Sequence, residues 1–280
     1  MQPSEVCRMP EARDLRGFLE IAVESAQKAG RLIRDNRGTL SLGDIAVKQA
    51  FDFVTRVDTE SEALILDTIR KRFPDHHFLA EESLHEIETD DFRWIIDPLD
   101  GTTNYIHGFP FSAVSIALQY KREIIIGVVY DPFRNELFTA VKGGGAFLDG
   151  KKITVSTVSQ MANALIATGF PFKRKELIEH YLTLFKNIFL EVSDIRRAGS
   201  AALDLAYIAC GRFDGFFEIG LGPWDCAAGS LMIKEAGGVI TNFGGGEDFL
   251  STGNMVAGNA LIHAMLQDKV KEVFAGIIDK

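Results

Sequence analysis

The stretch Trp94–Pro110, WIIDPLDGTTNYIHGFP, decides how the rest of the sequence is interpreted. Trp94–Ile96 is apolar and β-favouring, which predicts the end of a buried strand. The strand is expected to stop at Asp97, because Pro98 cannot continue a central strand. Asp97 and Asp100 leave it within one tight turn, so their carboxylates face a common volume and repel each other. A shared proton or a divalent cation would relieve that repulsion.

The residues that follow predict the start of a helix. Gly101-Thr102-Thr103-Asn104 supplies hydroxyl and amide side chains, which suit helix N-termini. Free backbone N–H groups at such a position can hold a phosphate group. The pattern D-P-x-D-G-T is also a good turn sequence without any ligand, so this stretch alone leaves a turn-only interpretation open.

Composition restricts the class of partner. Thirty Lys and Arg residues against 39 Asp and Glu residues give a formal net charge of −9, which argues against direct nucleic-acid binding. No apolar run is long enough for a membrane helix, and Met1–Gly17 lacks the apolar core of a signal peptide. The three cysteines have no metal-type spacing, which is typical of reduced thiols. We therefore expect a cytoplasmic protein without a membrane partner.

The chain is predicted to be one α/β (α+β) domain, residues 1–280, built from two closely packed halves. The halves cover about residues 16–152, which would bind the metal, and 153–275, on the substrate side; residues 1–15 are expected to be flexible. Helices are expected over 18–34, 59–73, with Asp58 as the N-cap, 201–210, 227–236 and 260–274. Strands are expected over 113–120, 123–131 and 136–141, as consecutive antiparallel neighbours, and over 255–258. The functional site would lie between the halves.

Three strand ends supply acidic residues to that site. The candidates are Glu81, Glu82, Asp97, Asp100 and Asp225. Ligand sites of α/β folds gather at such strand ends. Since no His or Cys has ligand spacing with them, the oxygen-only set favours Mg²⁺, or Mn²⁺ as an alternative, over Zn²⁺.

Three motifs together resemble the inositol monophosphatase family. They are Glu81-Glu82-Ser83, the stretch Trp94–Pro110, and Trp224–Gly229 running on to Glu235–Gly238, in the family's order. The segments ATGFPFK (167–173) and IRRAGSAALDLAYIACGRFDGFFEIG (195–220) are most similar to the bacterial, extragenic-suppressor branch. The resemblance covers roughly residues 18 to 265. It implies the layered α-β-α-β-α sugar-phosphatase fold shared with fructose-1,6-bisphosphatase.

The resemblance also implies roles for the acidic residues. Glu81, Asp97 and the Leu99 carbonyl correspond to ligands of a first Mg²⁺, and Asp97, Asp100 and Asp225 to ligands of a second, with a weaker third ion near Glu81. Asp97 would bridge the two metals. Thr102, together with Glu81, would orient the attacking water, because a threonine hydroxyl is too weak an acid to act as the base alone.

Substrate contacts are implied on both sides of the scissile bond. The residues are Leu99, Asp100, Gly101, Thr102, Arg196, Gly199, Ser200, Ala201, Glu218 and Asp225. The alternative is structural: Arg196 would only bridge to surface acids, and Glu218 would only pair with a neighbouring arginine. Glu82, Lys48 and Asp58 are expected outside the direct ligands, in supporting positions or in a loop near the metals.

The function implied is hydrolysis of inositol 1-phosphate to myo-inositol and phosphate, dependent on Mg²⁺ and inhibited by Li⁺. Within the same class, fructose 1,6-bisphosphate, a 3′-phosphonucleotide or histidinol phosphate are alternative substrates. In a different class, the chain could be an interaction protein of the transcription machinery, as some bacterial relatives are. The resemblance further implies a homodimer.

Overall fold

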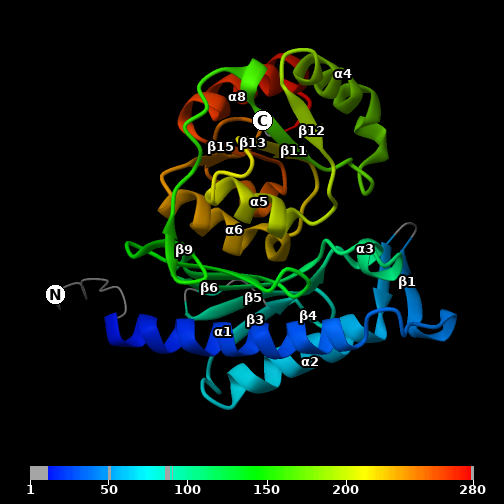
Figure 1. Ribbon diagram of the computed structural model, residues 1–280, viewed down its shortest axis with the longest axis vertical. Helices are drawn as coiled ribbons and strands as arrows, with labels where there is room; N and C mark the ends of the chain where they lie inside the picture. Colours follow the sequence, from blue (N-terminus) through cyan, green and yellow to red (C-terminus); the bar gives the residue numbers. More distant parts are fainter. Residues whose placement is uncertain (1–11, 50–51, 86–88, 90, 279–280) are drawn as a thin grey trace, which may run out of the picture.

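The structure, a computed structural model, describes residues 12–49, 52–85, 89 and 91–278. Its elements stack in the order α-β-α-β-α, as the resemblance implied (Figure 1). Helices α1 (Ala12–Asp35) and α2 (Arg56–Arg70) cover one face of an eight-stranded sheet. Helices α5 (Ala201–Ala209) and α6 (Pro223–Glu235) form the middle layer. A five-stranded sheet follows, and α4 (Ile178–Phe189) and α8 (Ala260–Phe274) cover its outer face.

The larger sheet is formed by a continuous part of the chain. Its strands are β3 (His77–Ala80), β4 (Leu84–His85), β5 (Arg93–Asp100), β6 (Ala113–Tyr120), β7 (Glu123–Asp131), β8 (Glu136–Val141), β9 (Gly145–Leu148) and β10 (Lys151–Ile153), in the spatial order β10-β9-β8-β7-β6-β5-β3-β4. The three antiparallel strands β6, β7 and β8 have the predicted bounds and neighbours. Short loops between alternating or apolar runs account for this success, because both are local signals.

The smaller sheet is mixed. Its spatial order is β12 (Asp194–Arg196), β11 (Leu165–Thr168), β13 (Gly215–Glu218), β15 (Met255–Gly258) and β14 (Val239–Thr241). Strand β11 runs parallel to β12 and β13, whereas β15 is antiparallel to β13. Outside the two sheets lie a hairpin, β1 (Ile45–Gln49) and β2 (Asp52–Thr55), the short helices α3 (Thr102–Ile106) and α7 (Phe249–Thr252), and three single turns of 3₁₀ helix (42–44, 161–163 and 175–177).

Strand β5 is longer than predicted and runs through Pro98 to Asp100. The pairing of β5 with β6 is irregular between Asp97 and Asp100. Proline is tolerated at such a bulge because no ladder hydrogen bond is required there. Because of the bulge, the side chains of Asp97 and Asp100 do not follow the regular alternation between the two faces of the sheet.

Three helices begin earlier than predicted. Helix α1 starts at Ala12, so residues 12–15 are helical, while residues 1–11 lie outside the described part of the chain. Helix α2 starts at Arg56 and is capped by Thr55, not by Asp58, which is the third helical residue. Helix α6 starts at Pro223, which places Asp225 inside its first turn. Proline at the first helical position and an acid in the first turn are both common at helix starts.

The middle layer joins the two sheets into one hydrophobic core. That core contains Ile95 and Phe138 from the larger sheet, Phe216 from the smaller one, and most of α5 and α6. A Cβ atom at Gly127 of β7 would lie 2.7 Å from the backbone oxygen of Ala228, so glycine there permits the close packing of α6 on the sheet. None of the helices in the described ranges is long and apolar enough to cross a membrane.

Candidate active site

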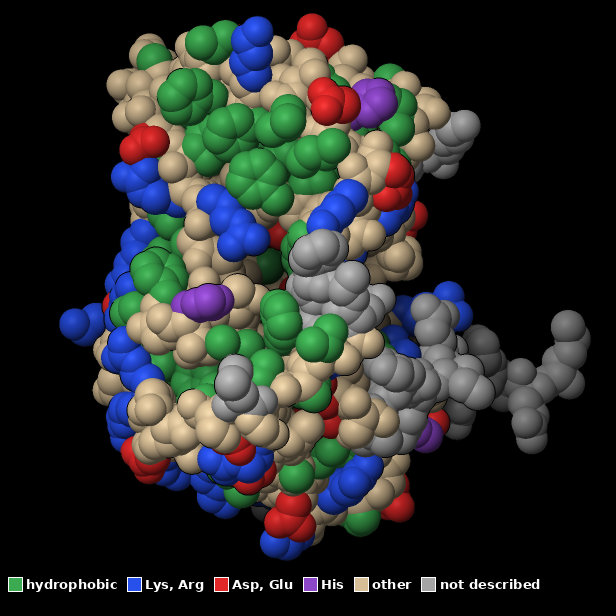
Figure 2. Space-filling view, turned by 90° about the vertical axis from the view of Figure 1, so that its right-hand side faces the viewer, with side chains coloured by type: hydrophobic (Ala, Val, Ile, Leu, Met, Phe, Trp, Pro, Cys, Tyr) green, Lys and Arg blue, Asp and Glu red, His purple; other side chains and the backbone are tan. Residues whose placement is uncertain are grey.

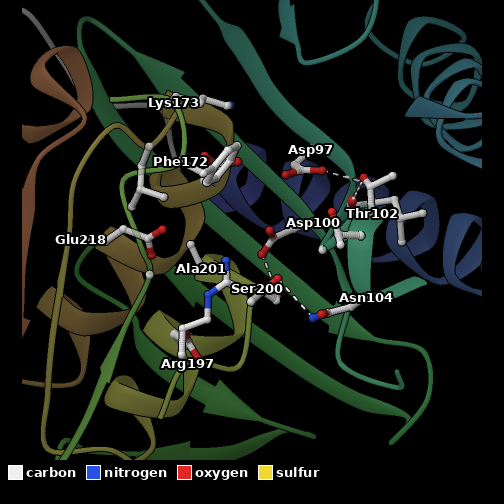
Figure 3. Close-up of a pocket in the computed structure, with 18 of the residues that line it drawn as sticks. Asp97, Asp100, Thr102, Asn104, Phe172, Lys173, Arg197, Ser200, Ala201 and Glu218 are labelled. Atoms are coloured by element: carbon white, nitrogen blue, oxygen red, sulfur yellow. Dashed lines mark hydrogen bonds between the residues drawn. The ribbon is translucent and has the colours of Figure 1, made fainter. Parts of the chain in front are cut away.

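A cavity of about 360 Å³ opens between the two sheets, at the ends of β5, β11 and β13 and the starts of α3, α5 and α6. Acidic side chains from both parts of the chain line it, and Figure 3 shows how they face one another. Asp97, Asp100 and Thr102 lie on one side, and Glu218 and Arg197 lie on the other. On the outer surface, Lys and Arg side chains flank the recess between the two halves of the molecule (Figure 2).

Three carboxylates meet at the centre of this cavity. One carboxylate oxygen from each of Asp97, Asp100 and Asp225 lies within 4.8 Å of the others. Asp97 and Asp100 come from the bulged end of β5, and Asp225 comes from the first turn of α6. Glu81, which follows β3, lines the same cavity. The structure thus brings together the acidic residues that the sequence predicted as metal ligands; their roles stay a prediction.

Backbone hydrogen bonds hold Asp97 in place. The Leu99 N–H donates to Asp97 Oδ1 over 2.9 Å, which closes a tight turn across Pro98. The Ser61 hydroxyl of α2 donates to the Pro98 carbonyl over 2.9 Å. Gly101 follows with a φ of 93°, a left-handed conformation that favours glycine, and it caps α3. These two hydrogen bonds fix the turn, so Asp97 and Asp100 project from one rigid segment.

Asp100 connects the two parts of the chain. Its Oδ2 accepts hydrogen bonds from the Ser200 hydroxyl over 2.6 Å and from the Ala202 N–H over 2.7 Å, both at the start of α5. Asp225 in turn accepts from the Gly222 N–H over 2.7 Å. Asp97, Asp100 and Asp225 therefore each accept hydrogen bonds from the chain through one carboxylate oxygen, which leaves the other oxygen for a ligand.

The electrostatics of the cluster are unfavourable without a cation. Burial, followed by the charges of Glu81, Asp100 and Asp225, raises the pKa of Asp97 well above its ordinary value. Burial and Asp225 likewise raise the pKa of Asp100, and burial and Glu81 raise that of Asp225. A buried set of carboxylate oxygens with no nitrogen or sulfur donor fits a hard divalent cation. The residues present therefore fit the metal that the sequence pattern implied.

Lys48 is placed beside Glu81 and Glu82. Its ammonium group lies 3.1 Å from Glu81 Oε1 and 2.6 Å from Glu82 Oε1. Glu82 does not line the cavity, and its backbone N–H donates to the buried Glu62 over 2.8 Å. Burial raises the pKa of Glu82 to about 7. Lys48 and Glu82 thus lie next to Glu81 without lining the cavity, and a supporting role for them stays a prediction.

Thr102 is hydrogen-bonded to Asp58, and this pairing was not predicted. The Thr102 hydroxyl lies 2.8 Å from Asp58 Oδ1 and 3.1 Å from the Leu99 carbonyl oxygen. The other carboxylate oxygen of Asp58 accepts from the backbone N–H and hydroxyl of Thr55, in a capping box that starts α2. Burial raises the pKa of Asp58 to about 6. Asp58 is therefore the hydrogen-bond partner of the Thr102 hydroxyl, and the joint action of Thr102 and Glu81 on the attacking water stays a prediction.

On the far side of the cavity the predictions are met in part. Gly199, Ser200, Ala201 and Glu218 line the cavity. Arg196 does not: its side chain is exposed and forms an ion pair with Asp194 over 2.5 Å. Arg197, its neighbour, lines the cavity in its place. This corrects the predicted substrate contact of Arg196, because successive residues leaving a strand point to opposite sides.

The lining residues that the sequence reasoning missed include Phe172, Lys173, Arg197 and Asp204. Lys173 and Phe172 lie in the segment ATGFPFK, which the sequence singled out only as a mark of the bacterial branch. Asp204 belongs to the predicted helix 201–210, one turn after Ser200-Ala201. Its i, i+3 relation to Ala201 and i, i+4 relation to Ser200 were the available signal for it.

Comparisons with known proteins agree with this geometry. The family model described as inositol monophosphatase family matches residues 14–275. Proteins named Nus factor SuhB, from Escherichia coli and Salmonella typhimurium, are 51% identical over 258 residues, which cover 91% of this chain and 97% of theirs.

Solved structures give the same result. The extragenic suppressor protein suhB from Bartonella henselae superposes with a TM-score of 0.87 at 43% identity, covering 91% of this chain and 99% of that one. An inositol monophosphatase from Anabaena has a TM-score of 0.83 at 39% identity, covering 93% and 97%. With the layered fold and the acidic cavity, these matches lead to one conclusion: the chain belongs to the inositol monophosphatase family.

Proposed function

We propose that this chain is a Mg²⁺-dependent phosphate monoester hydrolase that converts inositol 1-phosphate and water to myo-inositol and phosphate. The observation that carries the proposal is the acidic cluster of Asp97, Asp100 and Asp225, within 4.8 Å, in a cavity that Glu81 and Thr102 also line. When bound, two or three Mg²⁺ ions would supply the positive charge that offsets a phosphate dianion and its leaving alkoxide.

The ligand roles follow the predicted assignment. Glu81, Asp97 and the Leu99 carbonyl would hold one cation, and Asp97, Asp100 and Asp225 the second. The Lys48 ammonium group lies 3.1 Å from Glu81 Oε1, so this carboxylate already attracts a positive charge. Gly101 and Thr102, at the start of α3, would position the phosphate group.

Thr102 and Asp58 would handle the proton of the attacking water. The Thr102 hydroxyl donates its hydrogen to Asp58 over 2.8 Å, which leaves its lone pairs free to accept a hydrogen bond from water. As the water attacks phosphorus, its proton passes to Thr102 while the threonine proton passes to Asp58. A pKa of about 6 suits Asp58 to this role, because the group is ionised at neutral pH and still basic.

The alcohol part of the ester would lie towards Glu218, Gly199, Ser200 and Ala201. A polyol offers several hydroxyl groups, and the Glu218 carboxyl group can form hydrogen bonds with them. Burial, then the charge of Asp225, raises the pKa of Glu218 to about 8. The alternative substrates are fructose 1,6-bisphosphate, a 3′-phosphonucleotide and histidinol phosphate. The acidic cluster would act on the phosphate group alone, which all of these esters share, so it does not distinguish between them.

The direct test is phosphate release with and without Mg²⁺ across these four substrates. We expect inositol 1-phosphate to have the highest kcat/KM, chelation to abolish turnover, and Asp97→Asn to reduce it by at least ~10³-fold. Asp44→Asn, at a half-buried capping residue outside the cavity, is the matched control and should keep full activity. Turnover that persists under chelation would refute the metal-dependent reaction.

A second candidate is a role in transcription, which the name Nus factor SuhB of the relatives at 51% identity favours. A protein partner, not nucleic acid, fits a net charge of −9. Capture by purified transcription factors should then be equal for the wild type and Asp97→Asn. If Asp97→Asn loses both phosphate release and binding to the transcription factors, catalysis and partner binding share one site.

The expected homodimer has a candidate surface. Hydrophobic side chains gather on the upper part of the face in Figure 2, over α4, where Leu182 and Phe189 are exposed. Sedimentation of the wild type against Phe189→Ser would test it, with a shift to monomer expected.

A further inference from the structure

Asp204 is a buried carboxyl group in the wall of the cavity. It lies in the first turn of α5, and only 1% of its surface is exposed. Its Oδ1 has no hydrogen-bond partner within the described chain. A buried polar oxygen without a partner is unfavourable and uncommon in folded proteins. Asp204 therefore calls for a reason beyond the packing of α5.

Helix capping does not provide that reason. Ser200 caps α5 by accepting from the Leu203 N–H, and it also donates to Asp100. An acid in the first turn does interact favourably with the helix dipole. An exposed acid would gain the same interaction without being removed from water, so the dipole does not explain why Asp204 is buried.

The surroundings of Asp204 indicate what it would bind. Glu218 and Asp100 are the acidic groups whose charges act on Asp204, and Arg197 is the basic group that acts on it. Burial, then Glu218 and Asp100, raises the pKa of Asp204 well above its ordinary value. A protonated carboxyl group both donates and accepts hydrogen bonds, so its preferred ligand is an alcohol hydroxyl and not an anion.

We propose that Asp204 determines specificity for the alcohol part of the substrate, beside Glu218. This inference rests on the proposed function. With the phosphate at the acidic cluster, the alcohol extends along the start of α5, and one of its hydroxyls completes the hydrogen bonding of Asp204, directly or through one water molecule. An ester without such hydroxyls leaves Asp204 unpartnered.

The test compares two substrates in three variants. We measure kcat/KM for inositol 1-phosphate and for p-nitrophenyl phosphate, which has no alcohol hydroxyls, and take their ratio so that damage to the acidic cluster cancels. Asp204→Asn, which also donates and accepts, should keep the ratio within about twofold of the wild type. Asp204→Leu and the smaller Asp204→Ala should lower it by roughly tenfold. An unchanged ratio in either apolar variant overturns the proposal.

Thermal unfolding supplies a readout that needs no turnover. Asp204→Leu should raise Tm, since it removes a buried oxygen without a partner. Addition of myo-inositol with inorganic phosphate should raise the Tm of the wild type and of Asp204→Asn, but not that of Asp204→Leu. If Asp204→Leu has a lower Tm than the wild type, or if myo-inositol with phosphate raises the Tm of both proteins equally, Asp204 has a structural role and the proposal is overturned.

Asp214→Asn is the matched control. Asp214 is a buried carboxylate of the same half, and it accepts from the Leu165 N–H over 2.7 Å away from the cavity. Its variant should lower Tm and leave the substrate ratio unchanged. If the wild type hydrolyses no ester, the proposed function fails, whereas an active wild type with an unchanged ratio in the Asp204 variants refutes this inference alone.

Discussion

The pairing of Thr102 with Asp58 makes the sharpest prediction. Asp58→Asn keeps the size of the side chain and can still accept the hydrogen bond from Thr102, but an amide cannot take up a proton. We expect kcat to fall by roughly 10²–10⁴-fold, the usual weight of a general base, which corresponds to about 3–5 kcal/mol of barrier. Thr102→Ala should cost a similar amount, whereas Thr102→Ser should keep most of the activity.

The double variant shows whether the two residues act together. If the proton passes along the 2.8 Å hydrogen bond, either single change breaks the path, so Asp58→Asn with Thr102→Ala should be hardly slower than each alone. Independent residues would instead multiply their losses. A multiplicative double variant, or Asp58→Asn within fivefold of the wild type, would refute the proton path.

The pH profile gives a second check on the same pairing. Asp58 must be ionised to accept a proton, and its pKa is raised to about 6. The kcat/KM of the wild type should therefore be full above that pH and fall about tenfold per unit below it. Asp58→Asn should lose this acidic limb. Asp44→Asn controls for damage to a helix start, because Asp44 forms the same capping box with Ser41 outside the cavity.

Further predictions concern the cluster, the alcohol side and the aromatic core. Asp97→Asn should raise the Tm of the metal-free protein by relieving repulsion, while Mg²⁺ should raise the Tm of the wild type more than that of the variant; calorimetry checks both. Millimolar Li⁺ should inhibit phosphate release at limiting Mg²⁺, and full activity would argue against the expected site. Glu218→Leu should lower the kcat/KM ratio of inositol 1-phosphate to p-nitrophenyl phosphate by roughly tenfold. Burial lowers the pKa of His76 from 6.5 to about 4, and its Nδ1 accepts from the Trp94 indole N–H over 3.0 Å. As the pH falls from 6.5 towards 4, His76 is protonated in the unfolded chain but not in the folded one, so the free energy of unfolding decreases. His76→Phe should flatten that decrease in urea titrations.

Local patterns explain which parts of the fold could be predicted. The strands β6, β7 and β8 and the helix α8 have the expected bounds because alternation, turn residues and helical periodicity are local signals. The start of α2 was placed three residues late, although Thr55-Arg56-Val57-Asp58 is a capping-box sequence that assigns the cap to Thr55. The bulge at Pro98 depends on the pairing with β6, a long-range contact that a single sequence does not reveal.

The site residues divide in the same way. Glu81, Asp97, Asp100 and Asp225 could be found because each follows a recognisable strand end or helix start. The bond between Thr102 and Asp58 joins residues 44 positions apart, and no local pattern links them. Arg196 was chosen over Arg197 because of the family resemblance alone. A shift of one residue at the end of β12 reverses which side chain faces the cavity.

Asp100 shows why the site depends on the whole fold. Its partners Ser200 and Ala202 lie a hundred residues away, at the start of the helix that forms the middle layer. These two hydrogen bonds draw Asp100 towards α5, while the repulsion from Asp225 opposes closure of the same cavity. Packing of the alanine-rich middle layer against both sheets must therefore hold the carboxylates together, since their own electrostatics would separate them. A cation that binds the assembled acids stabilises that packing by the same free energy, so cation affinity and the stability of the layered core are linked.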